Sequence, residues 1–577
     1  MTSANLDARD AEPPKPPTAA IPSAPESLST PAPDPNRWPA FVVMTVAVFM
    51  DLLDGSVVNV ALPTMQRDVG LSYASVQWVT AGYLLAFALI LITGGRLGDI
   101  LGRRKMFLVG VAGFTVASLL CGVAANPALL VGSRLLQGTM AGLMVPQVLS
   151  IIHVTFPHEE KGKVFAVHGG VGGIAATIAP LVGGVIVAAN IFGLDWRPIF
   201  LVNVPVGVLG LVLGARYIPE SRSTHAAKLD VPGVALSAAG MVLLLLPLTF
   251  GRDLGWPAWS YASLALSVIV LIGFVAYQRA KLHRGGAPLV ALNLFRSRSF
   301  SAALGLTLAV YVFTGMFMLS IYLYAQIGLG WSPLRNGLTM LAFALGAFVT
   351  ATASLIALVP KFGRTVLQVG ALVIGLGLVL FLLINGGLGY RVSSWSIAPA
   401  LFVIGLGFGA TATPISMFGL SQVSAADAGS ASGLINTKMQ LGFALGIAVA
   451  SLSFFAPLAP AARHAVDTVT PTIQRELSAT GIPAHEIDGV TAAFRVCATD
   501  WLSESSPTVA PPDCTPEPEV ARNPSASATW VRLITQVRSQ TFSDAFQVTL
   551  YTGLILMLLA FLAAAQLPRR ISAPGRE

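Results

Sequence analysis

Two aspartates lie three residues apart in the first long apolar segment of the chain, which runs from about residue 38 to Pro63. On an α-helix this spacing puts Asp51 and Asp54 on one face. Hydrocarbon penalises a carboxylate, so that face is expected to point into a helix bundle or a wet cavity.

Arg134 falls inside another apolar segment, about seven residues from its start. At 1.5 Å per residue it lies roughly 10 Å deep, and Asp54 lies about 13 Å from Pro63. The similar depths predict an ion pair. Burial and a nearby cation act in opposite directions on a carboxylate, so alternation between them gives a site whose proton affinity changes with conformation. The alternative is a static ion pair that fixes helix packing.

A second charged cluster is a glycine-rich turn between two apolar segments. It contains Gly95, Gly98, Asp99, Gly102, Arg103 and Arg104. The glycines permit a tight turn and close approach of neighbouring helices. We expect Asp99 to pair with the basic residues or to accept bonds from a helix N-terminus, which would form a latch for one conformer. Basic residues are also expected in cytoplasmic loops on topological grounds alone.

The composition is that of a membrane protein. Apolar residues make up 54 % of the 577 residues and charged residues 11 %, against about 25 % charged in soluble domains. The net charge of +8 does not indicate nucleic acid, because the basic residues sit at the ends of apolar segments. The scattered histidines show no metal-ligand spacing, and no phosphate-binding loop is present, so the sequence predicts neither an enzyme, a metal site nor ATP-driven transport.

Fourteen apolar segments are long enough to cross a bilayer. They begin near residues 38, 75, 104, 127, 162, 197, 231, 259, 299, 334, 365, 395, 428 and 541. An even number puts both termini on one side. The loops on that side carry 16 Lys and Arg and the short loops on the other side carry 5, so both termini are predicted to be cytoplasmic.

The predicted outer side carries one long loop, residues 457–540. It is rich in proline and contains two possible short helices. Either it is a poorly ordered insertion, or it forms a cap over the outer mouth or a docking surface for an extracytoplasmic partner. Cys497 and Cys514 lie in it and can form a disulfide in an oxidising compartment, although spacing alone does not fix a bridge.

Four motifs in order resemble the fourteen-span drug:proton antiporter family of the major facilitator superfamily. In chain order they are Asp54–Pro63, Gly95–Lys105, Arg134–Gly138 and Trp196–Pro205. The resemblance implies a membrane-embedded all-α facilitator fold with 14 transmembrane helices, in which two helices are inserted between two six-helix halves. The implied parts are a tail (1–37), an N-terminal half (38–218), the inserted helices (219–298), helices 9–13 of the C-terminal half (299–456), the loop (457–540), helix 14 (541–566) and a tail (567–577).

Two departures from that family concern helix five and helix thirteen. The helix-five antiporter motif is represented by Pro180, Gly183 and Gly184, with alanines where other glycines are usual. In helix thirteen Lys438 stands one position before the place of a usual arginine, which on a helix is a rotation of about 100°. Lys438 is one possible residue of a substrate pocket. Aromatic residues of helix nine could supply an adaptable apolar surface: Tyr311, Phe313, Phe317 and Tyr322.

The sequence therefore predicts a proton-coupled exporter of lipophilic, often cationic compounds in the cytoplasmic membrane, with the proton gradient in place of a cofactor. Asp54 is expected to be the principal proton-coupling residue, and Asp51, which the family pattern does not include, to matter less. One alternative is export of an endogenous lipid or metabolite. Another is a non-transporting receptor or scaffold that acts through the 457–540 loop.

Overall fold

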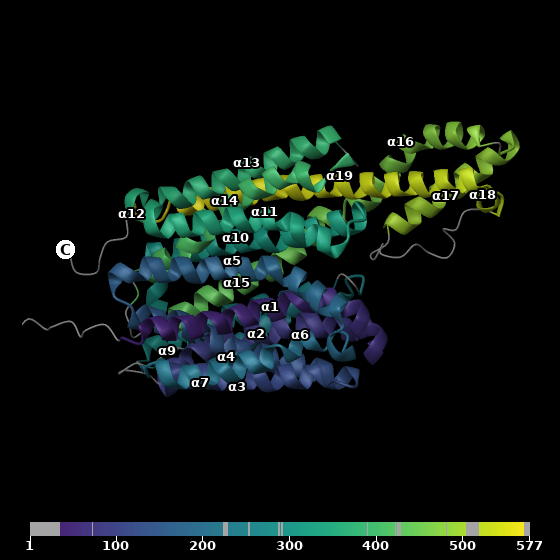
Figure 1. Cartoon of the computed structure of the whole chain (residues 1–577). Helices are drawn as coiled ribbons and strands as arrows, with labels where there is room; N and C mark the ends of the chain where they lie inside the picture. The colour runs from purple at the N-terminus through teal and green to yellow at the C-terminus, as the bar shows by residue number, and fades with distance from the viewer. Residues whose placement is uncertain are drawn as a thin grey trace, which may run out of the picture.

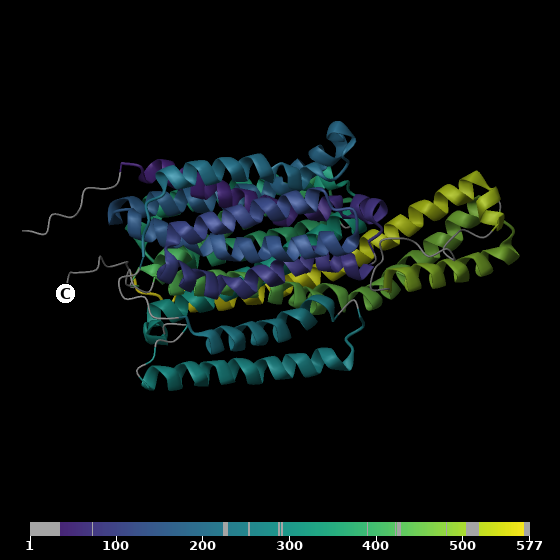
Figure 2. The same ribbon diagram turned by 90° about the horizontal axis from the view of Figure 1, so that it is seen from below.

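The computed structural model describes residues 35–569, apart from residues 72, 223–228, 252–253, 285, 287–288, 290–291, 389–390, 422, 424–427, 481 and 504–517, and apart from the side chains of some helical residues. All the secondary structure of the described residues is helical. The helices form a bundle of two halves, one above the other in Figure 1, with α5 and α15 between them. A helical extension projects beyond one end of the bundle (Figures 1 and 2).

The N-terminal half contains the first seven helices. They are α1 (Arg37–Val69), α2 (Tyr73–Leu101), α3 (Arg103–Gly122), α4 (Pro127–Thr155), α5 (His158–Ala189), α6 (Pro198–Leu201) and α7 (Asn203–Tyr217). Asn126 accepts a hydrogen bond from the Leu129 backbone and Pro127 occupies the first turn, so the start of α4 is fixed by its own sequence. In this half α4 packs against α2 and α3, while α5 packs against α1.

The C-terminal half contains six helices and a short one. They are α10 (Arg298–Leu323), α11 (Pro333–Ala353), α12 (Val359–Phe362), α13 (Thr365–Leu388), α14 (Ser394–Leu420), α15 (Ala428–Ala450) and α19 (Pro524–Ala564). Here α14 packs against α11 and α13, and α10 packs against α15 and α19. The halves meet where α5 contacts α11 and where α15 contacts α2.

The two inserted helices, α8 (Val231–Phe250) and α9 (Ala258–His283), form a layer on one side of the bundle, at the lower edge of Figure 2. Only α8 packs extensively on the bundle, against α2 and α15, while α9 packs on α8. Trp78 of α2 contacts Phe250 of α8 with ring centroids 4.9 Å apart.

Small residues allow the principal helix pairs to approach closely. A Cβ at Gly138 of α4 would lie 2.2 Å from the Tyr83 carbonyl of α2, and one at Gly315 of α10 would lie 2.2 Å from the Phe443 carbonyl of α15. Lipid tails are as apolar as the helix surfaces, so packing of this kind, rather than exclusion from water, holds membrane helices together.

Among the described residues, the largest apolar cluster that the two halves share lies at one end of the bundle. At the end where α1 begins and α19 ends, here called the termini face, one buried cluster joins residues of both halves, among them Phe41, Met144, Phe300 and Leu434. Toward the other end, here called the opposite face, the buried clusters of the two halves are separate. The bundle is therefore in a conformation closed at the termini face.

The extension is folded, which differs from the poorly ordered insertion considered from the sequence. Its described part comprises α16 (Leu458–Ala479), α17 (Ala484–Ser503), α18 (Pro518–Arg522) and the first turns of α19. It has a core of its own, in which Phe494 and Trp530 pack edge to face with ring centroids 4.9 Å apart. It projects away from the bundle rather than across its mouth (Figure 2).

The reason for this difference is helix continuity. The last helix was predicted to begin near residue 541, but α19 begins at Pro524 and is 41 residues long. The turn Ser451–Phe455, which is π-helical, continues α15 almost directly into α16. The extension is therefore carried by two long helices of the C-terminal half.

Within the described part of the chain, 12 helices are long and apolar enough to cross a membrane, or 13 if the bent pair Trp78–Leu91 and Thr93–Leu101 is one span. The prediction of a multi-span, all-α facilitator fold agrees with this arrangement. The number of fourteen spans stays a prediction.

Candidate functional site

The centre of the N-terminal half contains a buried ion pair between α1 and α4. A guanidinium nitrogen of Arg134 lies 2.5 Å from a carboxylate oxygen of Asp54. Arg134 is 1 % exposed and Asp54 is 3 % exposed. The structure therefore brings together the two residues whose depths in the sequence predicted a pair.

Polar groups from three further helices complete the surroundings of Asp54. Its other carboxylate oxygen accepts hydrogen bonds from the side-chain amides of Gln137 and Asn203, each at 2.9 Å. Gln137 also donates to Ser118 at 2.8 Å. Arg134 donates to the Gln137 oxygen at 2.7 Å and to the Val79 carbonyl of α2 at 2.9 Å. A carboxylate with one cation and two amide donors is well accommodated as the charged form, even when buried.

Asp51 lies one helical turn away and has different surroundings. It is 6 % exposed, and it accepts a 2.5 Å hydrogen bond from the hydroxyl of Tyr83. No ion pair to Asp51 is formed by the described residues. The Tyr83 ring lies beneath the guanidinium of Arg134, with 4.2 Å from the guanidinium carbon to the ring centroid. Tyr83 therefore contacts Asp51 through its hydroxyl and the cation that binds Asp54 through its ring.

The glycine-rich turn forms a second buried ionic site at the termini face. Asp99 at the end of α2 and Arg103 at the start of α3 lie 2.7 Å apart, and both side chains are nearly inaccessible. Gly102 between them has φ of +111°, a conformation that favours glycine. The pairing of Asp99 with the basic cluster that the sequence predicted is therefore present.

Glu220, beyond the end of α7, binds the same turn and was not predicted. Its carboxylate accepts hydrogen bonds from the backbone N–H groups of Arg104 and Lys105, each at 3.2 Å. A carboxylate is favoured at the first turn of a helix, here α3. A Cβ at Gly102 would lie 2.7 Å from this carboxylate, so a larger residue there would displace the Glu220 side chain.

The other residues of the glycine-rich turn, which we call the gate (Gly95–Lys105), connect the turn to neighbouring helices. Arg104 donates a hydrogen bond from its guanidinium to the Ala215 carbonyl of α7. A Cβ at Gly98 would overlap the Gln147 side chain of α4, which donates to the Gly94 carbonyl at 2.7 Å. Gly95 is buried within α2. The turn therefore ties α2, α3, α4 and α7 together.

The helix-five motif contributes helix packing rather than polar chemistry. A Cβ at Gly183 would lie 3.0 Å from the Val57 side chain of α1, so α5 and α1 approach closely there. Gly184 faces open space. The side chain of Pro180 lies outside the described residues.

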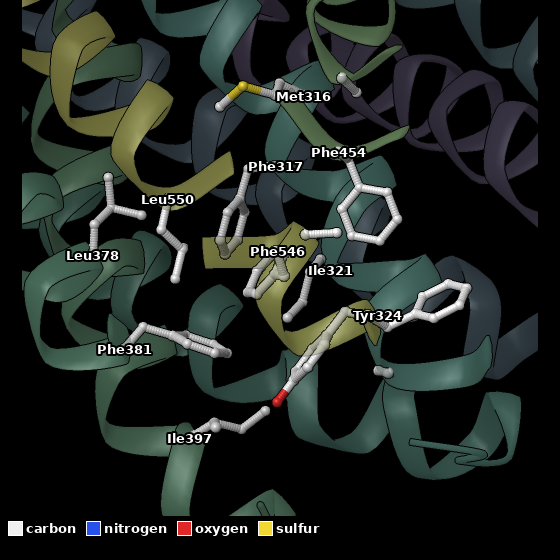
Figure 3. Packing of buried hydrophobic residues seen from close by; sticks show 14 of the residues in the cluster. Met316, Phe317, Ile321, Tyr324, Leu378, Phe381, Ile397, Phe454, Phe546 and Leu550 are labelled. Carbon is white, nitrogen blue, oxygen red and sulfur yellow. The ribbon is translucent and has the colours of Figure 1, made fainter. Parts of the chain in front are cut away.

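The aromatic residues of α10 do not form one pocket, because they lie on different faces of the helix. Phe313 and Phe317 are buried and stack with ring centroids 5.4 Å apart. Phe317 belongs to the core that Figure 3 shows around Phe546. Tyr322 is 41 % exposed. The two phenylalanines are therefore core residues of the C-terminal half.

Tyr311 packs at the edge of that core, and Lys438 lies on the neighbouring helix α15. The Tyr311 ring contacts Phe408 of α14. A Cβ at Gly442 would lie 2.8 Å from the Tyr311 Cβ, and the half-buried Lys438 is one helical turn before Gly442 on α15. Tyr311 and Lys438 remain candidate substrate contacts.

The cysteines and metal-ligating residues add no chemical site. Cys497 in α17 is disulfide-bonded, and Cys121 is free and buried. Cys514 lies outside the described residues. No group of three or more His, Cys, Asp or Glu residues with metal-binding geometry occurs in the described ranges.

Comparison with known proteins identifies the class. The model of the Major Facilitator Superfamily matches residues 44–447. The chain is 39 % identical over 559 residues to the probable actinorhodin transporter of Streptomyces coelicolor, with 96 % of each chain covered. It is 35 % identical to the tetracenomycin C resistance and export protein of Streptomyces glaucescens, covering 71 % of this chain and 75 % of that protein.

The chain therefore belongs to the major facilitator superfamily. It is a multi-pass membrane transporter and not an enzyme. Among solved structures, that of the human organic anion transporter MFSD10 aligns with 92 % of this chain and 99 % of that one, with a TM-score of 0.51 at 15 % identity, which shows a shared fold. At 96 % coverage, the alignment with the actinorhodin relative includes most of the extension.

Proposed function

We propose that this transporter is a proton-coupled exporter of lipophilic, often cationic compounds across the cytoplasmic membrane, with both termini in the cytoplasm. The observation that carries the proposal is the buried cluster of Asp51, Asp54 and Arg134 at the centre of the N-terminal half, away from the second buried ion pair at the termini face. Ionisable residues at membrane depth are costly, and they mark ion and proton pathways.

The gate supports the alternating-access part of the proposal. Its ionic bonds and the shared apolar cluster both lie at the termini face. With the termini in the cytoplasm, the structure corresponds to a conformer closed on the cytoplasmic side and ready to release substrate outward. Rocking of one half against the other about a fixed central site is the usual mechanism in such folds.

The names of the relatives support a small-molecule cargo. The two relatives described above are named for actinorhodin and tetracenomycin C. Export of an endogenous metabolite is therefore the second candidate function. The match to the actinorhodin relative along nearly the whole chain favours it specifically. In either case the energy source is the proton gradient and no cofactor is needed.

The test is a flux assay in inverted membrane vesicles with an imposed pH gradient. Accumulation of a lipophilic cation such as ethidium, together with proton release from the vesicles, is the expected result. Accumulation that persists after the gradient is collapsed by a protonophore would contradict proton coupling. Substituting an aromatic metabolite for ethidium distinguishes the two cargo classes.

A receptor that acts through the extension makes a different prediction. Deletion of residues 458–523 should leave measurable flux if the bundle is a transporter in its own right. Complete loss of activity, with the bundle still folded and inserted, would favour the receptor or scaffold.

A further inference from the structure

The two acidic residues of α1 are not equivalent, although both are buried. Asp54 is bound by one guanidinium and two amide groups. Asp51 is bound by one neutral hydroxyl, that of Tyr83, on its Oδ1 atom. Among the described residues no hydrogen bond reaches its Oδ2 atom.

These surroundings accommodate different protonation states. A buried charge without a cation or several donors is far more costly than a buried neutral acid. Arg134 is the cation nearest to both acids, and its donors already serve Asp54, Gln137 and the Val79 carbonyl. Asp51 is therefore accommodated here as the neutral acid, with its proton on Oδ2, while Asp54 is accommodated as the carboxylate.

We propose that Asp51, rather than Asp54, carries the exchanged proton, and that Tyr83 is the positioning residue that links it to the Asp54–Arg134 pair. This deepens the proposed function and rests on it. It also reverses the order of importance expected from the sequence.

The geometry of Tyr83 gives the link. Its hydroxyl donates to Asp51, while its ring supports the Arg134 guanidinium by a cation–π contact. A guanidinium that moves along this ring toward Asp51 would favour loss of the proton from Asp51 Oδ2 to water. The reverse movement would favour its uptake. The charged and titratable groups that act on Asp51 are Tyr83 of α2, Asp54 of α1 and Arg134 of α4.

Charge balance at Asp51 favours the exchange of this proton for a lipophilic cation. Once Asp51 loses its proton, the site holds one more negative charge, which a bound cation neutralises. Binding of one cation would then release one proton, and the overall charge of the site would stay constant. The affinity for the cation should then change by about tenfold per pH unit while the site is protonated.

The first measurement does not depend on transport. Infrared difference spectroscopy of the purified full-length protein detects the C=O stretch of a protonated carboxylic acid. We expect this band at neutral pH in the wild type and in the double variant Arg134→Gln with Asp54→Asn, which removes both charges of the pair without freeing the guanidinium, and its loss in Asp51→Asn. Loss of the band in the double variant but not in Asp51→Asn would overturn the proposal, whether or not the protein proves to be a proton-coupled exporter.

The second measurement is the binding of tetraphenylphosphonium as a function of pH. Asp51→Asn, which imitates the neutral acid in shape, should fold, bind the cation weakly and show no pH dependence or proton release. Tyr83→Phe keeps the ring beneath Arg134 and should move the midpoint of the pH profile to higher pH, since a donor to the carboxylate is lost. Full proton release by Asp51→Asn would reject Asp51 as the carrier.

A matched control is available in the C-terminal half. Tyr324 is a buried tyrosine whose hydroxyl donates to the Asn385 side chain at 2.9 Å, without an acid. Tyr324→Phe loses an equivalent buried hydrogen bond, so it should affect stability as much as Tyr83→Phe does. Its pH midpoint should stay that of the wild type, and an equal shift in both variants would show that Tyr83 has only a structural role.

Discussion

The two halves of the bundle have the same helical architecture but interiors of opposite chemistry. The N-terminal half is centred on the ion pair Asp54–Arg134 and its amide partners. The C-terminal half is centred on aromatic rings, in which Phe546 stacks on Tyr324 with centroids 4.8 Å apart and meets Phe381 at 5.2 Å (Figure 3). Its principal buried polar group in this region is the bond between Tyr324 and Asn385.

This difference assigns different tasks to the halves. Ionic bonds at low dielectric have strong, directional energies that change with one proton, so the N-terminal half is suited to change state. Close-packed rings change little unless a side chain is removed. The C-terminal half, which also carries the extension on two long helices, is suited to move as one body.

The largest expected effect is on the polar interior. Arg134→Gln leaves the Asp54 carboxylate buried without its cation, and breaking a buried pair from one side costs about 3–5 kcal/mol. We expect loss of folded protein in membranes, measured by thermal unfolding in detergent. The double variant Arg134→Gln with Asp54→Asn removes both charges and should regain much of the stability while transport stays absent. If the single variant is as stable as the double variant, the ion pair does not contribute to the stability of the folded protein.

A smaller effect is expected in the aromatic interior. Phe317→Ala removes a side chain that stacks on Phe313 and contacts Phe546, and such cavities cost about 3 kcal/mol in well-packed cores. Thermal stability should fall, but the pH dependence of flux should stay that of the wild type. Leu383→Ala on α13 is a control, because Leu383 is 69 % exposed to the surroundings of the bundle. A changed pH dependence in Phe317→Ala would show that the halves do not divide their tasks in this way.

The sequence predicted the interior of the N-terminal half better than that of the C-terminal half. Charge in an apolar segment is rare, so Asp51, Asp54 and Arg134 were visible, and depth along a helix paired two of them correctly. Aromatic residues occur on every face of a membrane helix. For that reason Phe313 and Phe317 resembled pocket residues, although they lie in the core.

The partners of the ionic sites were harder to predict. Gln137 and Asn203 fall inside motifs already noted, but neutral amides give no signal of burial by themselves. Tyr83 and Glu220 belong to no motif, and each meets its partner through tertiary packing between helices distant in sequence. The extension shows the same limit, since its fold depends on contacts of α16, α17 and α19 rather than on local periodicity.

The gate provides an intermediate test, since it is an ionic site of the N-terminal half at the closed termini face. Asp99→Asn removes the charge that binds Arg103, and the change should shift the population of conformers by about 1–2 kcal/mol, the scale of two-state switching. Labelling of single cysteines placed at the two faces should show increased access from the termini face. Glu220→Gln weakens the bonds to the α3 N-terminus and leaves the Asp99–Arg103 pair in place, so it should give a smaller shift in the same direction. Unchanged labelling with normal transport in both variants would show that the turn does not control the conformer, and that its basic residues only set the membrane topology.

The smallest effect is expected where the extension meets solvent, because the extension packs on itself and on α19 rather than on the N-terminal half. Replacing Cys497 and Cys514 with serine removes any bridge between them, and closure of an eighteen-residue ring is worth about 3 kcal/mol in the chain-entropy model. That energy acts on the extension, whereas the bundle is held by its own helix packing. The variant should therefore insert and transport nearly normally, while protease added from the outside cleaves the extension faster. Mass spectrometry of an unreduced digest checks the bridge itself, and free thiols at both positions would remove the basis of this prediction. If the bridge is present and its loss abolishes efflux, the extension takes part in the transport cycle, and the division of tasks between the two halves must include it.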